Sequence, residues 1–260
     1  MSDFDSFKSS GYTMPRPFEC AVESDGVRQL VFDLTKQYLI EHEDALPLTA
    51  KLQLPFKDVP PPQLWSDIMN GVNESSALQK LLISPAIVSR FRSLLDAELE
   101  MFPISFFRAQ FPWMERSVYS WHQDMGTWYA SRVPWLGRYR PVTLWFSLNG
   151  ADQENSLDIA VNSDRNQLFS HSHVPDQGSF RAEIDFDPEE KFEVFVPKCD
   201  ADEGMFFSDL CLHRTRRGPG LRPRYSVDIR YYDPKCLARP DVPISFRLKR
   251  MYQMLIGRSG

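Results

Sequence analysis

Apolar side chains recur three or four residues apart through much of the first hundred residues, which is the spacing of amphipathic helices. Between Val27 and Leu39 this spacing places them on one helix face. Two further helices are expected to start at proline, which is favoured in a first turn. The last should end where Phe102 precedes Pro103, because the residue before proline avoids the helical conformation. The expected helices cover residues 27–39, 60–69 and 85–102.

After Pro103 the pattern changes to short aromatic or β-branched segments separated by Gly, Pro, Asn and Asp, which is typical of strands and turns. Several short strands at this spacing predict a sandwich or barrel rather than alternating strand–helix units. No glycine-rich phosphate loop follows any of them, which argues against a Rossmann or P-loop fold. The expected strands cover residues 104–110, 118–123, 142–148, 157–161, 193–196, 204–207 and 224–231. The chain is therefore predicted to be an α+β protein.

The tail is expected to form one more helix. Pro243 can start it, apolar side chains follow, and Gly257 is a suitable stop. We expect this helix to pack on the sheet, as most amphipathic helices pack on their own core, and joining a partner subunit is the alternative. The chain is thus predicted to be a single domain with a mainly helical part at 1–102, a β core at 103–235 and a C-terminal helix at 236–260.

Composition narrows the class of protein. The 260 residues are 42% hydrophobic and 25% charged, as in ordinary globular proteins, and the net charge of −5 provides no overall basic field for nucleic-acid binding. No apolar run approaches the roughly 18 residues of a membrane span. The acidic N-terminus lacks a secretory signal, and four scattered cysteines without a C-x-x-C pair fit a reducing compartment. We therefore expect a cytoplasmic protein that contacts neither nucleic acid nor membrane.

The segment Trp121-His122-Gln123-Asp124 carries the first candidate site. Residues two apart on a strand point to the same side, so His122 and Asp124 can offer a nitrogen and an oxygen to one metal ion. His213 follows another expected strand, and a jelly roll can bring two such distant strands together. Two histidines and one carboxylate are the ligands expected of a non-haem Fe(II) oxygenase. Each feature alone also fits a hydrogen-bonded polar residue without a metal.

Arg224 and Ser226 form the second candidate site. They begin the strand that follows His213 and would share one of its faces. A guanidinium grips a carboxylate with two hydrogen bonds, and a hydroxyl adds one more, which suits the distal carboxylate of 2-oxoglutarate. The alternative is a salt-bridged strand arginine.

At these residues the chain resembles the phytanoyl-CoA hydroxylase-like family of Fe(II)- and 2-oxoglutarate-dependent oxygenases, which includes ectoine hydroxylase. The resemblance spans roughly residues 117–232. It implies a double-stranded β-helix, or jelly roll, of the cupin type, with Fe(II), 2-oxoglutarate and O2 as cofactors. It also implies roles for matched positions. The metal ligands would be His122, Asp124 and His213, Thr215 and Trp145 would join Arg224 at the cosubstrate, and Thr127 and Trp128 would border the substrate.

The resemblance also bears on the reaction. Related halogenases have a small residue where this chain has Asp124, so the carboxylate implies hydroxylation of an unactivated C–H bond in a small molecule. Desaturation, demethylation and epimerisation stay open. Residues 155–165 stand where the family usually has a Pro-Gly-Ser-His stretch.

Arginines close to the expected ligands favour an anionic substrate. Arg132 lies in an aromatic segment that can form a wall over the metal, and more arginines follow His213. The alternative is a solvated loop whose charges are balanced by nearby acids. The arginines after the distal histidine are Arg214, Arg216, Arg217 and Arg222.

Two other functions remain as alternatives. A cupin-type metalloenzyme can use the same three ligands without 2-oxoglutarate, and a non-catalytic binding protein can share the fold. Formation of succinate separates the oxygenase from both.

Overall fold

The computed structural model describes residues 3–41, 61–111, 117–130, 134–164, 167–174, 182–218 and 222–236. The expected C-terminal helix from Pro243 and the predicted substrate residue Arg132 lie outside the described residues. Among the helices that the structure describes, none has the length and apolar character needed to cross a membrane.

Helices make up most of the described chain before residue 96. They are α1 (Asp3–Ser10), α2 (Ala21–Glu41), α4 (Pro61–Asn73), α5 (Ser76–Leu82) and α6 (Pro85–Leu95). The three expected helices are confirmed, with different ends, whereas α5 was not expected. Its cap is Ser75, whose side chain accepts a hydrogen bond from the Leu78 amide. The predicted end of α6 near Phe102 is wrong, because Asp96 adopts the left-handed conformation (φ 47°) that closes the helix.

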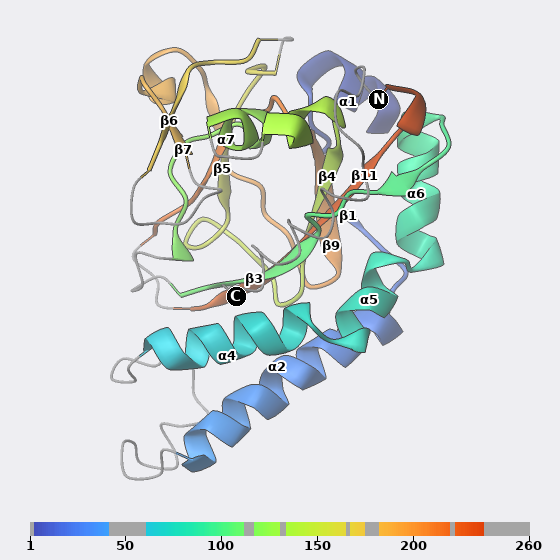
Figure 1. The fold of residues 1–260 in the computed structure, drawn as a ribbon, viewed down its shortest axis with the longest axis vertical. Coiled ribbons are helices and arrows are strands. Elements are labelled where there is room, and N and C mark those ends of the chain that lie inside the picture. The colour runs from blue at the N-terminus through green and yellow to red at the C-terminus, as the bar shows by residue number, and fades with distance from the viewer. Residues whose placement is uncertain are drawn as a thin grey trace.

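In the described part of the chain the strands form one large antiparallel sheet and two small ones (Figure 1). The large sheet has the order β1-β9-β4-β11-β2, with β3 also pairing with β11. Its strands are β1 (Arg16–Pro17), β2 (Glu100–Met101), β3 (Phe106–Gln110), β4 (Val142–Ser147), β9 (Glu203–Ser208) and β11 (Arg224–Tyr232). The small sheets contain β5 (Leu157–Ala160), β8 (Val194–Phe195) and β10 (His213–Thr215), and the pair β6 (His171–His173) and β7 (Ala182–Ile184).

Six of the seven expected strands are confirmed, and the strand at 118–123 is wrong. There His122 makes only an isolated bridge to His213, and Asp124 begins the helix α7 (Asp124–Ala130). The inference that His122 and Asp124 share a side because they share a strand is therefore wrong as well. Three short 3-10 helices complete the described elements, η3 (Pro134–Arg138), η4 (Pro188–Glu190) and η5 (Pro234–Cys236).

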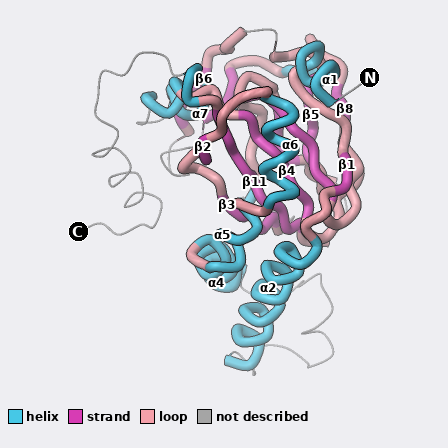
Figure 2. The backbone as a smooth tube through the Cα atoms, turned by 90° about the vertical axis from the view of Figure 1, so that its right-hand side faces the viewer, coloured by secondary structure: helices cyan, strands magenta, loops and turns pink. Residues whose placement is uncertain are grey.

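The strand β11 is buried along its whole length and separates two environments. One face carries Tyr225, Val227, Ile229 and Tyr231, which belong to the main apolar core together with residues of α2, α4, α5 and α6. Figures 1 and 2 show these helices along one side of the large sheet, with the small sheets on the other side. The opposite face of β11 is polar, because side chains alternate along a strand. It carries Arg224, Ser226, Asp228 and Arg230 into the interior between the sheets.

Candidate metal centre

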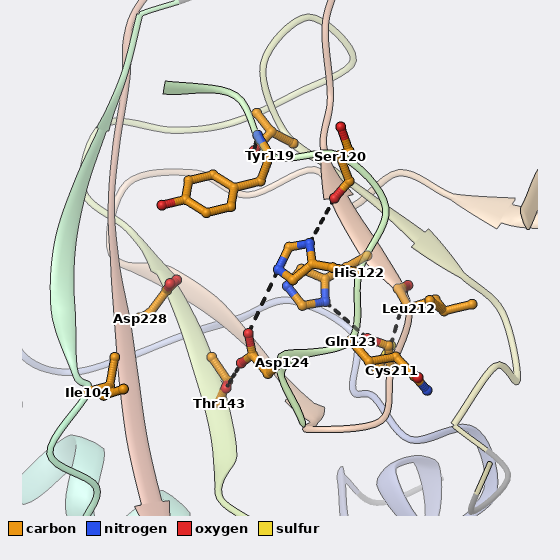
Figure 3. A network of polar contacts seen from close by, with 12 residues as sticks. Ile104, Tyr119, Ser120, His122, Gln123, Asp124, Thr143, Cys211, Leu212 and Asp228 are labelled. Atoms are coloured by element: carbon orange, nitrogen blue, oxygen red, sulfur yellow. Dashed lines mark hydrogen bonds and ion pairs between the residues drawn. The ribbon is translucent and has the colours of Figure 1, made fainter. Parts of the chain in front are cut away.

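Three buried side chains meet at one point in this interior. The ligand atoms of His122, Asp124 and His213 all lie within 4.8 Å of one another, and the structure shows no other such group among the described residues. His122 Nε2 and Asp124 Oδ1 are 3.8 Å apart (Figure 3). The two histidines are held by reciprocal backbone hydrogen bonds of 3.0 Å, and their rings lie 4.2 Å apart. Asp124 reaches the same point from the first turn of α7.

Each imidazole is prepared to act as a metal ligand. The Nδ1 of His122 lies 2.8 Å from the Ser120 carbonyl, and the Nδ1 of His213 lies 3.0 Å from the Cys211 carbonyl. Since a carbonyl only accepts, both protons reside on Nδ1 and both Nε2 atoms are left to bind a metal. Burial lowers the pKa of both histidines, His122 strongly, so the rings are neutral at pH 7.

The two oxygens of Asp124 have different surroundings. Its Oδ2 accepts hydrogen bonds from Thr143 Oγ1 (3.1 Å) and from Nε (3.1 Å) and Nη2 (2.8 Å) of Arg230. Burial acts to raise the pKa of Asp124, but the charge and hydrogen bonds of Arg230, together with the two histidines, outweigh it and keep the pKa below its usual value. Oδ1 faces His122. The site therefore offers one carboxylate oxygen and two imidazole nitrogens to a metal.

Gln123, between two of the ligands, fastens this segment to its surroundings. It is fully buried, and its amide donates to the carbonyls of Gln167 (2.8 Å) and Leu210 (2.6 Å) and accepts from the Phe169 amide (2.9 Å). Its backbone amide donates to Nε2 of His171 at 2.9 Å. Sequence reasoning missed this role, because all of these partners lie more than forty residues away in the chain.

A cavity of about 80 Å³ opens beside the histidines, several times the volume that one water needs. Of the residues predicted to bind 2-oxoglutarate, Trp145, Thr215 and Arg224 line it. Ser226 is fully buried beside them on β11 and pairs in the sheet with Ser147 and Arg108. The lining also includes residues of α4 and β3, which sequence reasoning did not connect with the site. These are Trp65, Met69, Arg108, Ala109 and Gln110.

Arg224 is a buried cation that lacks an acid partner among the described residues. Its Nη1 donates to the carbonyls of Asn155 and Ser156, both at 2.7 Å, and its guanidinium lies over the ring of Trp145 at 5.3 Å. Burial lowers its pKa to about 9. Within the part of the chain that the structure describes, the Nε of Arg224 has no hydrogen-bond partner.

Further buried polar atoms around Arg224 also lack partners among the described residues. They are Gln110 Oε1, Trp145 Nε1, Ser147 Oγ and Ser226 Oγ. Each unsatisfied buried group costs about 1–3 kcal/mol, so such a concentration is unusual in a folded protein. Most of these atoms can donate a hydrogen bond, and they lie beside a guanidinium whose charge is not balanced within the described chain. Such a set of groups fits a carboxylate ligand. The residues present therefore fit 2-oxoglutarate on chemical grounds.

Two of the residues predicted to border the substrate, Thr127 and Trp128, lie in α7, outside the lining of this cavity. Thr127 is buried and its Oγ1 has no hydrogen-bond partner in the described chain. Trp128 is buried against the ring of Phe102 at 5.0 Å, in an apolar cluster that also contains Tyr139.

Three of the arginines that lie between His213 and Arg224 have acid partners within the described chain. Asp158 pairs with Arg214 (2.6 Å) and Arg216 (2.7 Å), and Asp152 pairs with Arg222 (2.9 Å). The alternative of charges balanced by nearby acids is therefore confirmed for these three arginines. They give no support for an anionic substrate.

Known structures with the same fold were found across nearly the whole chain. The non-haem monooxygenase ThoJ is 14% identical over 98% of this chain and 95% of its own, with a TM-score of 0.61. EctD from S. alaskensis, with 2-oxoglutarate and 5-hydroxyectoine, is 16% identical over 91% and 77% of the two chains, with a TM-score of 0.57. The epimerase SnoN, with Fe3+, α-ketoglutarate and nogalamycin RO, is 15% identical over 89% and 82%, with a TM-score of 0.54.

No protein-family profile and no curated protein sequence matches the chain. At these identities the structural likeness establishes the fold. The expected resemblance to this group of structures, with ectoine hydroxylase among them, is confirmed. The chain thus has the fold of the non-haem iron, 2-oxoglutarate-dependent enzymes.

Proposed function

We propose that this protein is an Fe(II)- and 2-oxoglutarate-dependent oxygenase that hydroxylates a C–H bond of a small molecule. The observation that carries the proposal is the meeting of His122, Asp124 and His213 beside a cavity that also contains Arg224. Two histidines and one carboxylate that leave three positions open are the ligands of non-haem Fe(II) oxygenases. We further propose that the large sheet and the sheet of β10, β5 and β8 are the two faces of a double-stranded β-helix.

The chain's own residues prepare the metal position. The neutral histidines present Nε2, and Arg230 and Thr143 occupy one oxygen of Asp124, so a metal receives three protein ligands. When bound, iron with 2-oxoglutarate and O2 oxidises a C–H bond to an alcohol, and 2-oxoglutarate leaves as succinate and CO2.

Arg224 would bind the distal carboxylate of 2-oxoglutarate. Its Nε and the Oγ of Ser226, which have no partners among the described residues, supply donors, and Trp145 supports the guanidinium from its ring face. Thr215 lines the same cavity, although its Oγ1 already accepts a hydrogen bond from the Tyr119 amide (3.1 Å). Leu157 and Phe207 are buried apolar residues that keep bulk water from the metal.

The test is turnover of 2-oxoglutarate to succinate with Fe(II), ascorbate and O2. Asp124→Ala and His213→Ala should abolish even the slow uncoupled reaction, because each removes a metal ligand. Arg224→Met should raise the 2-oxoglutarate concentration needed for half-maximal turnover by about 10- to 100-fold, since a charged hydrogen-bond donor is lost. Arg222→Met, which changes an exposed ion pair, is the matched control.

Succinate formation that survives both ligand substitutions would refute the metal assignment. Iron binding without any succinate would instead support a cupin-type metalloenzyme that does not use 2-oxoglutarate. ThoJ is named a monooxygenase and SnoN an epimerase, although they share this fold. Product analysis is therefore needed to separate hydroxylation from epimerisation.

A further inference from the structure

Arg108 of β3 is a second guanidinium on the wall of the cavity. It lies between the rings of Phe106 (4.4 Å) and Tyr119 (4.3 Å), which hold it in one orientation. Its Nε donates to Asp228 at 2.5 Å, and it also hydrogen-bonds to the Tyr119 hydroxyl. The side chain is 19% exposed, so it is accessible from the cavity.

The site carries an excess of one positive charge. Asp228 is shared by Arg108 and Arg230, whose Nη2 lies 3.4 Å from it. Within the described chain, the charged side chains that line the cavity or hold its ligands are three guanidinium groups and two carboxylates, because the histidines are neutral. They are Arg108, Arg224, Arg230, Asp124 and Asp228. A divalent metal and a dicarboxylate add no net charge, so the excess remains when both are bound.

Arg108, rather than Arg224 or Arg230, has donors left to bind a further anion. Arg230 is 2% exposed and its donors are used by Asp124, Thr143 and the Ile104 carbonyl. Arg224 is the proposed partner of the cosubstrate. A guanidinium has five N–H donors, and Asp228 and Tyr119 do not use all of those of Arg108.

We propose that Arg108 binds a carboxylate of the primary substrate, whose apolar part contacts Trp65 and Met69 of α4. The proposal rests on the function proposed above. A singly charged group matches the excess of one positive charge, and burying a guanidinium is favourable only when its charge is balanced. Trp65 and Met69 line the same cavity and supply an aromatic and a thioether surface.

The experiment compares benzoate with its neutral analogue benzamide. Both are titrated by calorimetry into the protein loaded with Ni(II), which replaces iron without turnover, and with 2-oxoglutarate. Benzoate should bind at least about 10-fold more tightly than benzamide, because only benzoate pairs with the guanidinium. Arg108→Met should abolish that difference, and Arg108→Lys should keep part of it because the charge remains. Arg214→Met, in a partly exposed ion pair outside the cavity, is the matched control and should keep the full difference.

Several outcomes would overturn the inference. Equal affinities for the two probes, no binding of either, or a preference that survives Arg108→Met would each do so. Displacement of 2-oxoglutarate by benzoate would also do so, because the anion would then occupy Arg224. Binding of Ni(II) and 2-oxoglutarate by each variant shows that it is folded. If the wild-type protein binds neither Ni(II) nor 2-oxoglutarate, the proposed function itself fails. This result distinguishes a failure of the proposed function from a failure of the inference about Arg108.

Discussion

At the scale of single residues, the proposed metal ligands are oriented by hydrogen-bond partners that would not touch the metal. The Ser120 and Cys211 carbonyls select the tautomer of each histidine, and Arg230 occupies one oxygen of Asp124. Hydrogen-bond partners of ligands typically matter almost as much as the ligands, because they fix orientation and basicity. Arg230 is therefore a positioning residue whose effect acts through Asp124.

Arg230→Met should weaken metal binding by about 10- to 100-fold, because Oδ2 of Asp124 loses both guanidinium hydrogen bonds. Thr143→Val, which removes one neutral hydrogen bond, should have a smaller effect. Both are measured as Ni(II) affinity by calorimetry. Arg230→Lys should recover part of the loss because it restores a charged donor. Wild-type affinity in Arg230→Met would show that Asp124 needs no such support.

At the scale of elements, α4 covers the outer edge of β3. Asn73 donates to the Phe107 carbonyl (3.2 Å) and accepts from the Phe107 amide (2.9 Å). One helical turn before Asn73, Met69 accepts from the Ala109 amide (3.2 Å), and a further turn back Trp65 donates to the Ala109 carbonyl (2.8 Å). An uncovered edge strand would leave these groups unpaired. Since β3 also carries Arg108 and Gln110, the N-terminal helices position one wall of the cavity.

Asn73→Ala should lower the free energy of unfolding by about 1–3 kcal/mol, because buried backbone groups of Phe107 lose their partner. Asn70→Ala is the matched control, since Asn70 is exposed on the same helix and the same chemical change is made there. Urea unfolding of both variants measures the difference. Equal free energies of unfolding for Asn73→Ala and Asn70→Ala would mean that the hydrogen bonds of Asn73 make no net contribution to stability.

The elements also show which features of the fold the sequence pattern predicts. Alternation in β11 is visible in the sequence, because Arg224, Ser226 and Asp228 alternate with apolar or aromatic residues that pack in the core. The end of α6 is not visible, because a left-handed Asp96 leaves no periodic signal. The sequence predicts that His122 and Asp124 lie together on a strand, and that local reason is wrong. They nevertheless converge, because the turn into α7 replaces the expected strand.

The sequence did not predict the roles of residues whose partners lie far away in the chain. Arg108, Gln110 and Arg230 resemble any polar strand residue until β3 and β11 are placed side by side. Gln123 resembles a spacer between two ligands until its partners around residues 167–171 and 210 are known. Such roles require the tertiary structure, because no local pattern records which chain segments meet.

At the scale of the whole molecule, buried ionisable groups make stability depend on pH in opposite directions. Burial lowers the pKa of His122, His171 and His213, so the unfolded chain binds protons there more readily, and stability falls as pH drops below about 6.5. Burial raises the pKa of Asp209 to about 6, although Arg140 pairs with it at 2.7 Å. For Asp209 the folded state binds the proton more tightly, so its contribution to stability is lost as pH rises.

Asp209→Asn should isolate the second effect. In the wild type, the contribution of Asp209 is fully present below about pH 4 and is lost as pH rises through about 6. A shift of about two pKa units corresponds to roughly 3 kcal/mol at most, since each unit is about 1.4 kcal/mol. The variant should therefore gain stability relative to the wild type, by up to that amount, as pH rises from 4 to 7. The ion pair with Arg140 is already included in the raised pKa of Asp209, so its loss takes nothing further from this gain.

The measurement is urea unfolding of the metal-free protein at half-unit pH steps, because metal binding has its own pH dependence. Asp33→Asn is the control, since Asp33 is exposed and the same chemical change is made there. The histidines contribute equally to wild type and variant, so they cancel in the difference between the two curves. A difference that stays constant from pH 4 to 7 would mean that Asp209 titrates alike in the folded and unfolded chain, with Arg140 fully compensating its burial.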